Sequence, residues 1–313
     1  MTLSFVLYLV INTVVVLALA PLFVSIIKKV KARTQGRSGP SIFQTYYNLA
    51  KLCRKEMLYS PHSSWIMRVT PLVNIAAMLV AALFVPLVFV TEPVGGIGNI
   101  ILLLYLLAMA KFFMALAGLD AGSSFGGMGS SREMSISAII EPTTIIVFAA
   151  LVFVFKTINV FAMFTASIAS GTPATPTLIL LGISLFIILI VETSRIPVDN
   201  PETHLELTMI HEGMILEQSG PNLALMELSA AVKLTLLMAL LINLILPFGL
   251  TTTLALGALA IALVLFVVKG AVLSLVIGLF ESSMAKMRFF RLPSLFAMAF
   301  FFSTLIIIME VFA

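Results

Sequence analysis

The sequence predicts an all-α polytopic membrane protein with about eight transmembrane helices and both termini on the outer side of the membrane. Hydrophobic residues make up 61% of the chain and charged residues only 10%, whereas soluble domains carry about 25% charged residues. The apolar stretches are long enough to cross the hydrocarbon layer, which takes about 20 residues. They are continuous rather than alternating, which favours helices over a β-barrel.

The expected spans follow one another in a single integral membrane domain, 1–313. The first is interpreted as retained, because residues 1–5 carry no basic side chain and the apolar run to Ile27 is too long for a signal peptide. The seventh is long enough to tilt or protrude. Residues 158–169 are apolar but too short to span, so a re-entrant or interfacial piece is expected. The eight spans are 3–27, 69–90, 98–118, 135–156, 177–194, 225–246, 250–280 and 292–312.

Lysines and arginines give the expected orientation. Fourteen of the 18 fall on one side of the predicted spans, and the positive-inside rule makes that side cytoplasmic. The cytoplasmic loops are then about 28–68, 118–135, 195–224 and 281–291. This distribution accounts for the net charge of +4, so the lipid bilayer is an expected partner and nucleic acid is not.

One cysteine limits the chemistry of the chain. Cys53 has no second cysteine to pair with, and the Cys and His clusters that bind iron–sulfur groups or structural zinc are missing from the sequence. We therefore expect no cofactor, no metal and no catalytic residue in this subunit.

The third loop is the richest in ionisable groups. Six acids lie in the stretch from Arg195 to Glu227 inclusive, and apolar residues are interspersed among them. They could form a solvated acidic surface. They could also be partly buried and carry protons, because buried carboxyl groups must pair, form hydrogen bonds or take up a proton. Glu141, Glu192 and Lys233 fall in or at the end of spans, where ionisable groups serve either structural pairing or ion relay.

The first two loops each allow two readings. From Ser41 the first loop has apolar residues at helical spacing, which predicts either an amphipathic helix on the membrane surface or a docking surface for a soluble partner. The second loop is rich in Gly and Ser. That composition suits a flexible linker, but it also lets two backbones approach closely.

Two loops resemble a known family. The first resembles the pattern A-R-x-Q-x-R-x-G-P…Q…K-L-x-x-K-E, and the third resembles E-T-x-R-x-P-x-D-x-P-E…E-L. Both patterns belong to the membrane subunit of respiratory complex I that joins the peripheral arm to the membrane arm. The matching residues are Ala32, Arg33, Gln35, Arg37, Gly39, Pro40, Gln44, Lys51, Leu52, Lys55 and Glu56, then Glu192, Thr193, Arg195, Pro197, Asp199, Pro201, Glu202, Glu206 and Leu207. Glu133 and Glu217 also fall where the family has glutamates.

The departures from complex I point to one branch. The stretch from Pro40 to Gln44 is shorter than the Gly-Pro segment near the complex I quinone entrance, and His204 replaces the middle acid of an E-x-E-x-E run. Residues 115–134 and 203–212 look like the corresponding subunit of the energy-converting (group 4) membrane-bound nickel–iron hydrogenases, including the formate hydrogenlyase type. Those enzymes pass electrons to protons and use no quinone.

The resemblance implies a non-catalytic anchor and ion-translocation coupling subunit in the inner (cytoplasmic) membrane, linking hydrogen evolution to proton or sodium transport. The implied partners are a hydrogenase large subunit with a nickel–iron centre, a small subunit with iron–sulfur clusters, and antiporter-like membrane subunits. The candidate proton-relay residues are Glu133, Glu141, Glu192, Asp199, Glu202, Glu206, Glu217 and Lys233, with Arg195 as counter-charge. The candidate docking residues are Arg33, Gln35, Arg37, Gln44 and Asp120.

Two alternatives remain open at this point. The first is a quinone-site subunit of a complex I-type dehydrogenase, which the short first loop and the missing acid disfavour. The second is a stand-alone secondary transporter, a class that often shows inverted repeats. No clear internal repeat is visible here, and the ionisable residues concentrate in loops.

Overall fold

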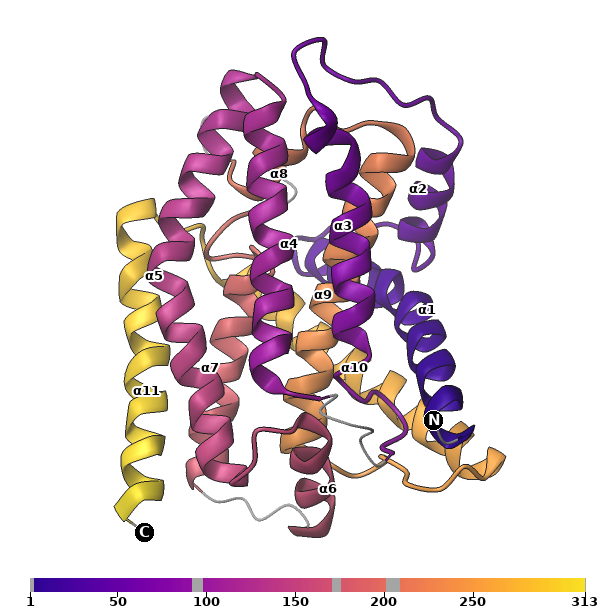
Figure 1. The fold of residues 1–313 in the computed structure, drawn as a ribbon, viewed down its shortest axis with the longest axis vertical. Coiled ribbons are helices and arrows are strands. Elements are labelled where there is room, and N and C mark those ends of the chain that lie inside the picture. Colours follow the sequence, from indigo (N-terminus) through magenta and orange to yellow (C-terminus); the bar gives the residue numbers. More distant parts are fainter. Residues whose placement is uncertain (1–2, 92–97, 171–175, 201–208, 313) are drawn as a thin grey trace.

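Helices make up most of the described chain (Figure 1). The computed structural model describes residues 3–91, 98–170, 176–200 and 209–312. Within these ranges no strand forms, and β-type pairing is confined to two isolated bridges. The all-α prediction is confirmed. The helices are α1 (Leu3–Thr34), α2 (Gln44–Cys53), α3 (Trp65–Ala82), α4 (Ile100–Asp120), α5 (Ser124–Phe155), α6 (Val160–Ser170), α7 (Pro176–Glu192), α8 (His211–Ile215), α9 (Gly220–Ile245), α10 (Leu256–Ser283), the 3-10 turn η1 (Phe289–Arg291) and α11 (Leu292–Phe312).

The helices form a bundle of membrane-crossing length. Among the described residues, α1, α3, α4, α5, α9, α10 and α11 are long and apolar enough to span a membrane. The expected span 177–194 is α7, which with 17 residues is shorter, and the expected short piece 158–169 is α6. Both termini lie toward the same end of the bundle, whereas the α4–α5 turn and α8 lie toward the other (Figure 1). Seven described helices reach spanning length where eight were expected, and α7 would be the eighth.

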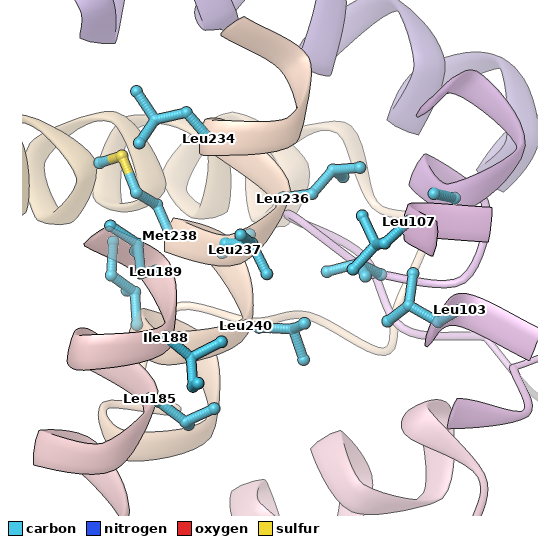
Figure 2. Close-up of a cluster of buried hydrophobic side chains, with 14 of the residues drawn as sticks. Leu103, Leu107, Leu185, Ile188, Leu189, Leu234, Leu236, Leu237, Met238 and Leu240 are labelled. Carbon is cyan, nitrogen blue, oxygen red and sulfur yellow. The ribbon is translucent and has the colours of Figure 1, made fainter. Parts of the chain in front are cut away.

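The apolar core surrounds α9. In its most apolar window 72% of the residues are buried, the highest share among the seven spans found in the described chain. Figure 2 shows Leu237 and Leu240 of α9 near Ile188 of α7 on one side and Leu103 of α4 on the other. α9 packs against α7 and α3, and α3 packs against α4, so polar groups on α4, α7 and α9 can meet in the middle of the bundle.

The expected loop 118–135 is largely helical. α4 continues to Asp120 and α5 begins at Ser124, so a short turn replaces the predicted loop. A Cβ on Gly118 would collide with the Ser130 side chain, and one on Gly126 would collide with the backbone of Gly118. The flexible-linker interpretation is therefore wrong, and the prediction that the glycines allow close backbone approach is confirmed.

Smaller differences concern element ends. α1 and α10 run past the expected spans to Thr34 and Ser283, and α10 begins at Leu256 rather than near residue 250. The expected span 69–90 is helical only to Ala82. The rest of that span is a buried segment without helical structure.

Residues 84–91 form this buried segment. Asn12 accepts a hydrogen bond from the backbone N–H of Leu87 at 3.0 Å, and Asn243 donates to the carbonyl oxygen of Leu87 at 3.1 Å. Lys269 donates to the Asn243 side chain at 3.1 Å. Irregular backbone at membrane depth needs such partners, because lipid offers none.

Candidate functional site

Three charged side chains meet where α7 ends. The carboxylate of Glu192 has the Nζ of Lys111, from α4, 3.0 Å from its Oε1, and the Nζ of Lys233, from α9, 2.8 Å from its Oε2. The three side chains are only 4%, 8% and 15% exposed, respectively. Buried charges need partners. Here one carboxylate pairs with two lysines. The three side chains, which we call the trio, together carry one net positive charge.

The end of α7 positions the carboxylate. α7 is apolar along its length up to Glu192. Ser194 then adopts a φ of 49°, which is uncommon for a residue other than glycine, and the N–H of Arg195 donates to the Ile190 carbonyl at 3.0 Å. Carbonyl groups at a helix C-terminus carry partial negative charge, so both the carboxylate and the helix end attract the two lysines.

A cavity of about 50 Å³ surrounds the trio. Glu133 from α5 and His211 from α8 line it together with the trio, and Glu133 is 7% exposed. About 10–15 Å³ suffices for one water molecule. This central cavity therefore has room for water in contact with two carboxyl groups, two amines and an imidazole.

A second cavity, of about 330 Å³, lies between α4 and α5. Lys111 and Glu192 line both this second cavity and the central cavity. Their ion pair therefore separates the two cavities. Glu141, an exposed residue of α5, also lines it. The second cavity therefore extends the polar region from the trio toward the side of the bundle.

A third cavity, of about 380 Å³, lies on the other side of His211, which lines both it and the central cavity. Lys28, Glu212 and Glu227 line its walls. Burial lowers the pKa of His211, and the nearby Glu212 carboxylate opposes that shift. Burial raises the pKa of Glu212, and the His211 charge opposes that shift. Both shifts favour the neutral forms of the two groups.

Arg195 is a counter-charge, as predicted, but its partner lies elsewhere in the chain. Its Nη1 lies 2.7 Å from the Oε1 of Glu281 on α10, and Lys31 of α1 lies 3.6 Å from the other oxygen of Glu281. These three residues line the third cavity. The arginine therefore joins the segment after α7 to α10.

Asp199 is placed apart from the trio. It is 1% exposed and accepts hydrogen bonds from the backbone N–H groups of Ile210 and His211 at 3.0 and 3.2 Å. Lys286 lies 2.7 Å from its other oxygen. These contacts fix the start of α8, and Asp199 lines none of the three cavities described above.

The remaining predicted relay residues include one described side chain and two undescribed ones. Glu217 is exposed after α8. Glu202 and Glu206 lie outside the described residues. Of the six predicted relay residues that the structure describes, the central cavity brings together Glu133, Glu192 and Lys233.

The predicted docking residues divide into two groups. The side chains of Arg33, Gln35, Arg37 and Gln44 are exposed around the end of α1 and the start of α2. Asp120 instead accepts hydrogen bonds from the backbone N–H groups of Ser64 and Met67 at 2.9 and 3.1 Å. Its carboxylate thereby stabilises the first turn of α3, which is a role within the chain.

Two residues central to this geometry are absent from the predicted set. Lys111 could have been found from sequence, because a lysine in the middle of an apolar span needs a partner. Glu281 carries no comparable signal, since it stands at the end of a long span where a carboxylate can reach water. Within the described chain, no group of three or more His, Cys, Asp and Glu residues could hold a metal ion.

Comparison with known proteins agrees with this arrangement. A family model described as NADH dehydrogenase matches residues 6–312. The chain is 35% identical to hydrogenase-4 component C of Escherichia coli (strain K12), over 89% of this chain and 87% of that protein. It is 33% identical to formate hydrogenlyase subunit 4 of the same organism, over 90% of this chain and 91% of that protein.

A solved structure shares the fold. A chain of the membrane-bound sulfane sulfur reductase, an archaeal respiratory membrane complex, superposes with a TM-score of 0.82 at 19% identity. The match covers 98% of this chain and 100% of that one. Sequence and fold agree over nearly the whole length, and the chain therefore belongs to the NADH dehydrogenase family, that of complex I subunit 1.

Proposed function

We propose that the chain is the membrane coupling subunit of an energy-converting hydrogenase complex, with protons passing through its three adjoining cavities. The observation that carries the proposal is the Lys111–Glu192–Lys233 trio, buried where two of the cavities meet. The similarity to subunits of hydrogenase-4 and formate hydrogenlyase supports the hydrogenase assignment. The nickel–iron centre and iron–sulfur clusters belong, in this proposal, to soluble partner subunits, and the membrane is the inner membrane.

The charges of the trio couple proton uptake on one side to proton release on the other. A proton that reaches Glu192 from the central cavity removes the negative charge that holds Lys111 protonated. A lysine in an apolar site without that partner releases its proton more readily. Because Lys111 also lines the second cavity, one proton entering on the His211 side is exchanged for one leaving toward Glu141.

Two surfaces suit the proposed partners. The exposed arginines at the end of α1 can bind carboxylates or backbone carbonyls of the hydrogenase large and small subunits in a bidentate way. Glu141 is exposed in the middle of a span, where an ionisable group is costly in contact with lipid. We propose that this side of α4 and α5 faces an antiporter-like membrane subunit, which continues the ion path.

The test replaces Lys111 by a residue that keeps the charge but not the proton chemistry. Arginine preserves the ion pair with Glu192, yet it does not deprotonate in proteins. In the purified complex, we expect Lys111→Arg to assemble normally while hydrogen production and ion uptake into vesicles fall together by about tenfold or more, equivalent to about 1.4 kcal/mol. Lys156→Arg, at the exposed end of α5, is the matched control.

A second variant distinguishes a loss of proton transfer from a packing defect. Glu141→Gln changes an exposed side chain, so it should not disturb the core, and we expect the same joint loss. Unchanged turnover and ion uptake in both Lys111→Arg and Glu141→Gln would leave the trio with a structural role and remove the relay.

A complex I-type quinone site is the second candidate. The third cavity favours it, because about 380 Å³ is within the range of ligand pockets. The same purified complex distinguishes the candidates. Quinone-dependent turnover without hydrogen production would assign the chain to the quinone branch, and ion transport by this chain alone would assign it to the transporters.

A further inference from the structure

A fourth cavity lies apart from the three that surround the trio. It has a volume of about 350 Å³ and sits where α5, η1 and the start of α11 meet. Three basic side chains line it, from Arg132, Lys286 and Arg288, and so do the apolar residues Phe289 and Leu292. We call it the α5–α11 pocket. It shares no lining residue with the other three cavities.

The α5–α11 pocket lies where two spans enter the apolar layer. Leu292 is the first residue of α11, which runs as an apolar span to Phe312. α5 packs against α11, and Arg132 stands just before the long apolar part of α5. Phe290, beside the pocket, is 92% exposed. Exposed aromatic rings at the start of a span are typical of the membrane–water interface.

The charges of the pocket favour an anion. Lys286 pairs with Asp199 at 2.7 Å, so those two charges cancel. Arg132 uses one N–H to donate to the Met209 carbonyl at 3.1 Å, which holds the guanidinium in the pocket wall and leaves further donors. Arg288 is exposed. Among the described residues that line the pocket, the two arginines leave a net charge of about +2 beside an apolar wall, and guanidinium groups bind phosphate in a bidentate way.

We propose that the α5–α11 pocket binds the headgroup phosphate of an anionic phospholipid. Arg132 and Arg288 bind the phosphate, and the acyl chains lie along α11. α11 offers room for them, since only 22% of its most apolar window is buried, the smallest share among the seven spans of the described chain. Basic pockets between transmembrane helices commonly bind anionic headgroups. This inference does not depend on the proposed hydrogenase function.

The test compares lipids and variants in the purified, delipidated complex. Phosphatidylglycerol should raise the apparent melting temperature of the parent protein, and phosphatidylcholine and inorganic phosphate should not. Arg288→Gln changes an exposed side chain. It should raise, by about tenfold, the phosphatidylglycerol concentration needed for half of the rise in melting temperature. Arg54→Gln, an exposed arginine at the end of α2, is the matched control and should respond like the parent.

Each alternative occupant has its own outcome. An equal effect of inorganic phosphate would identify a site for free anions, and an equal effect of phosphatidylcholine would show that the headgroup charge is irrelevant. Unchanged phosphatidylglycerol binding in both Arg288→Gln and the Arg132→Gln/Arg288→Gln variant, counted by native mass spectrometry, would overturn the proposal. A pocket that takes up lipid only after partner polypeptides are removed would be a protein interface.

Discussion

Glu192 shows how much one buried carboxylate can organise. Lys111 and Lys233 lie 81 and 41 positions from it in the sequence, yet both amines are within 3.0 Å of its oxygens. Removing one partner from a buried ion pair costs about 3–5 kcal/mol, because the other charge is left without compensation. In this trio the loss of Glu192 would leave two buried lysines, so the carboxylate is both a structural and an electrostatic centre.

Glu212 provides a prediction on pH dependence. Burial raises its pKa and the His211 charge only partly opposes this, so the folded protein holds the proton over a pH range in which the unfolded chain has lost it. Stability therefore falls as pH rises through that range. We expect Glu212→Gln to gain about 2–4 °C in apparent melting temperature relative to the parent between about pH 5 and pH 8.

The control for this experiment is Glu217→Gln, which changes an exposed carboxylate two residues beyond the end of α8. Because all three proteins keep His211, their differences isolate the carboxyl groups. A Glu212→Gln difference that stays constant across the pH range would mean that the buried carboxyl does not titrate with unfolding.

At the residue scale the sequence predicts which groups are ionisable at membrane depth, but not how they pair. Glu133, Glu192 and Lys233 were predicted and do line one cavity. Arg195 was expected to neutralise nearby acids, yet it pairs with Glu281, 86 positions away. Pairing depends on which helices pack together, and nothing in the local pattern around Arg195 contains that information.

At the element scale, the glycines of α4, α5 and α8 decide how closely the helices pack. A Cβ on Gly129 would lie 2.9 Å from the Ile210 carbonyl oxygen and 3.1 Å from the Met214 nitrogen. Both are backbone atoms, which cannot rotate aside as a flexible side chain can. The position of α8, and with it His211, therefore depends on the absence of a side chain on α5.

Gly129→Ala tests this dependence, and its neighbour Gly127 is the matched control. We expect Gly129→Ala to lose about 1–3 kcal/mol through overpacking and to lower the melting temperature and the recovery of the complex. A Cβ on Gly127 would meet nothing within 4 Å, so Gly127→Ala should be neutral or gain up to about 1 kcal/mol from helix propensity. Equal behaviour of the two variants would contradict the close packing.

Elements are well predicted where apolar runs are long and poorly predicted where glycine interrupts them. The spans that became α1, α9 and α11 follow the hydropathy of the sequence. The glycine-rich start of α5 was expected to be a loop, because glycine disfavours an isolated helix. Tertiary packing against α4 and α8 overrides that preference.

At the scale of the whole molecule, the basic residues around the α1–α2 connection predict where soluble partners bind. Gly36 and Gly39 have φ values of 74° and 73°, which fold this connection into a turn that presents Arg33 and Arg37 to solvent. The binding of hydrogenase subunits to this turn stays a prediction.

The double variant Arg33→Ala/Arg37→Ala should weaken this binding. We expect the chain to insert normally, while the soluble polypeptides recovered with it fall by about tenfold, equivalent to about 1.4 kcal/mol. Lys156→Ala removes an exposed positive charge at the end of α5 and should leave recovery unchanged. Full retention of active soluble subunits by the double variant would exclude docking through these arginines.

The buried segment 84–91 has a consequence for energy conservation. It lies among apolar side chains, and Asn12 and Asn243 satisfy its backbone. None of its residues lines the three cavities around the trio. An ion gradient of 100 mV stores about 2.3 kcal/mol per charge, and any water-filled leak across the bundle would dissipate it. In the proposed relay, this packed segment would resist leakage of charge straight across the bundle.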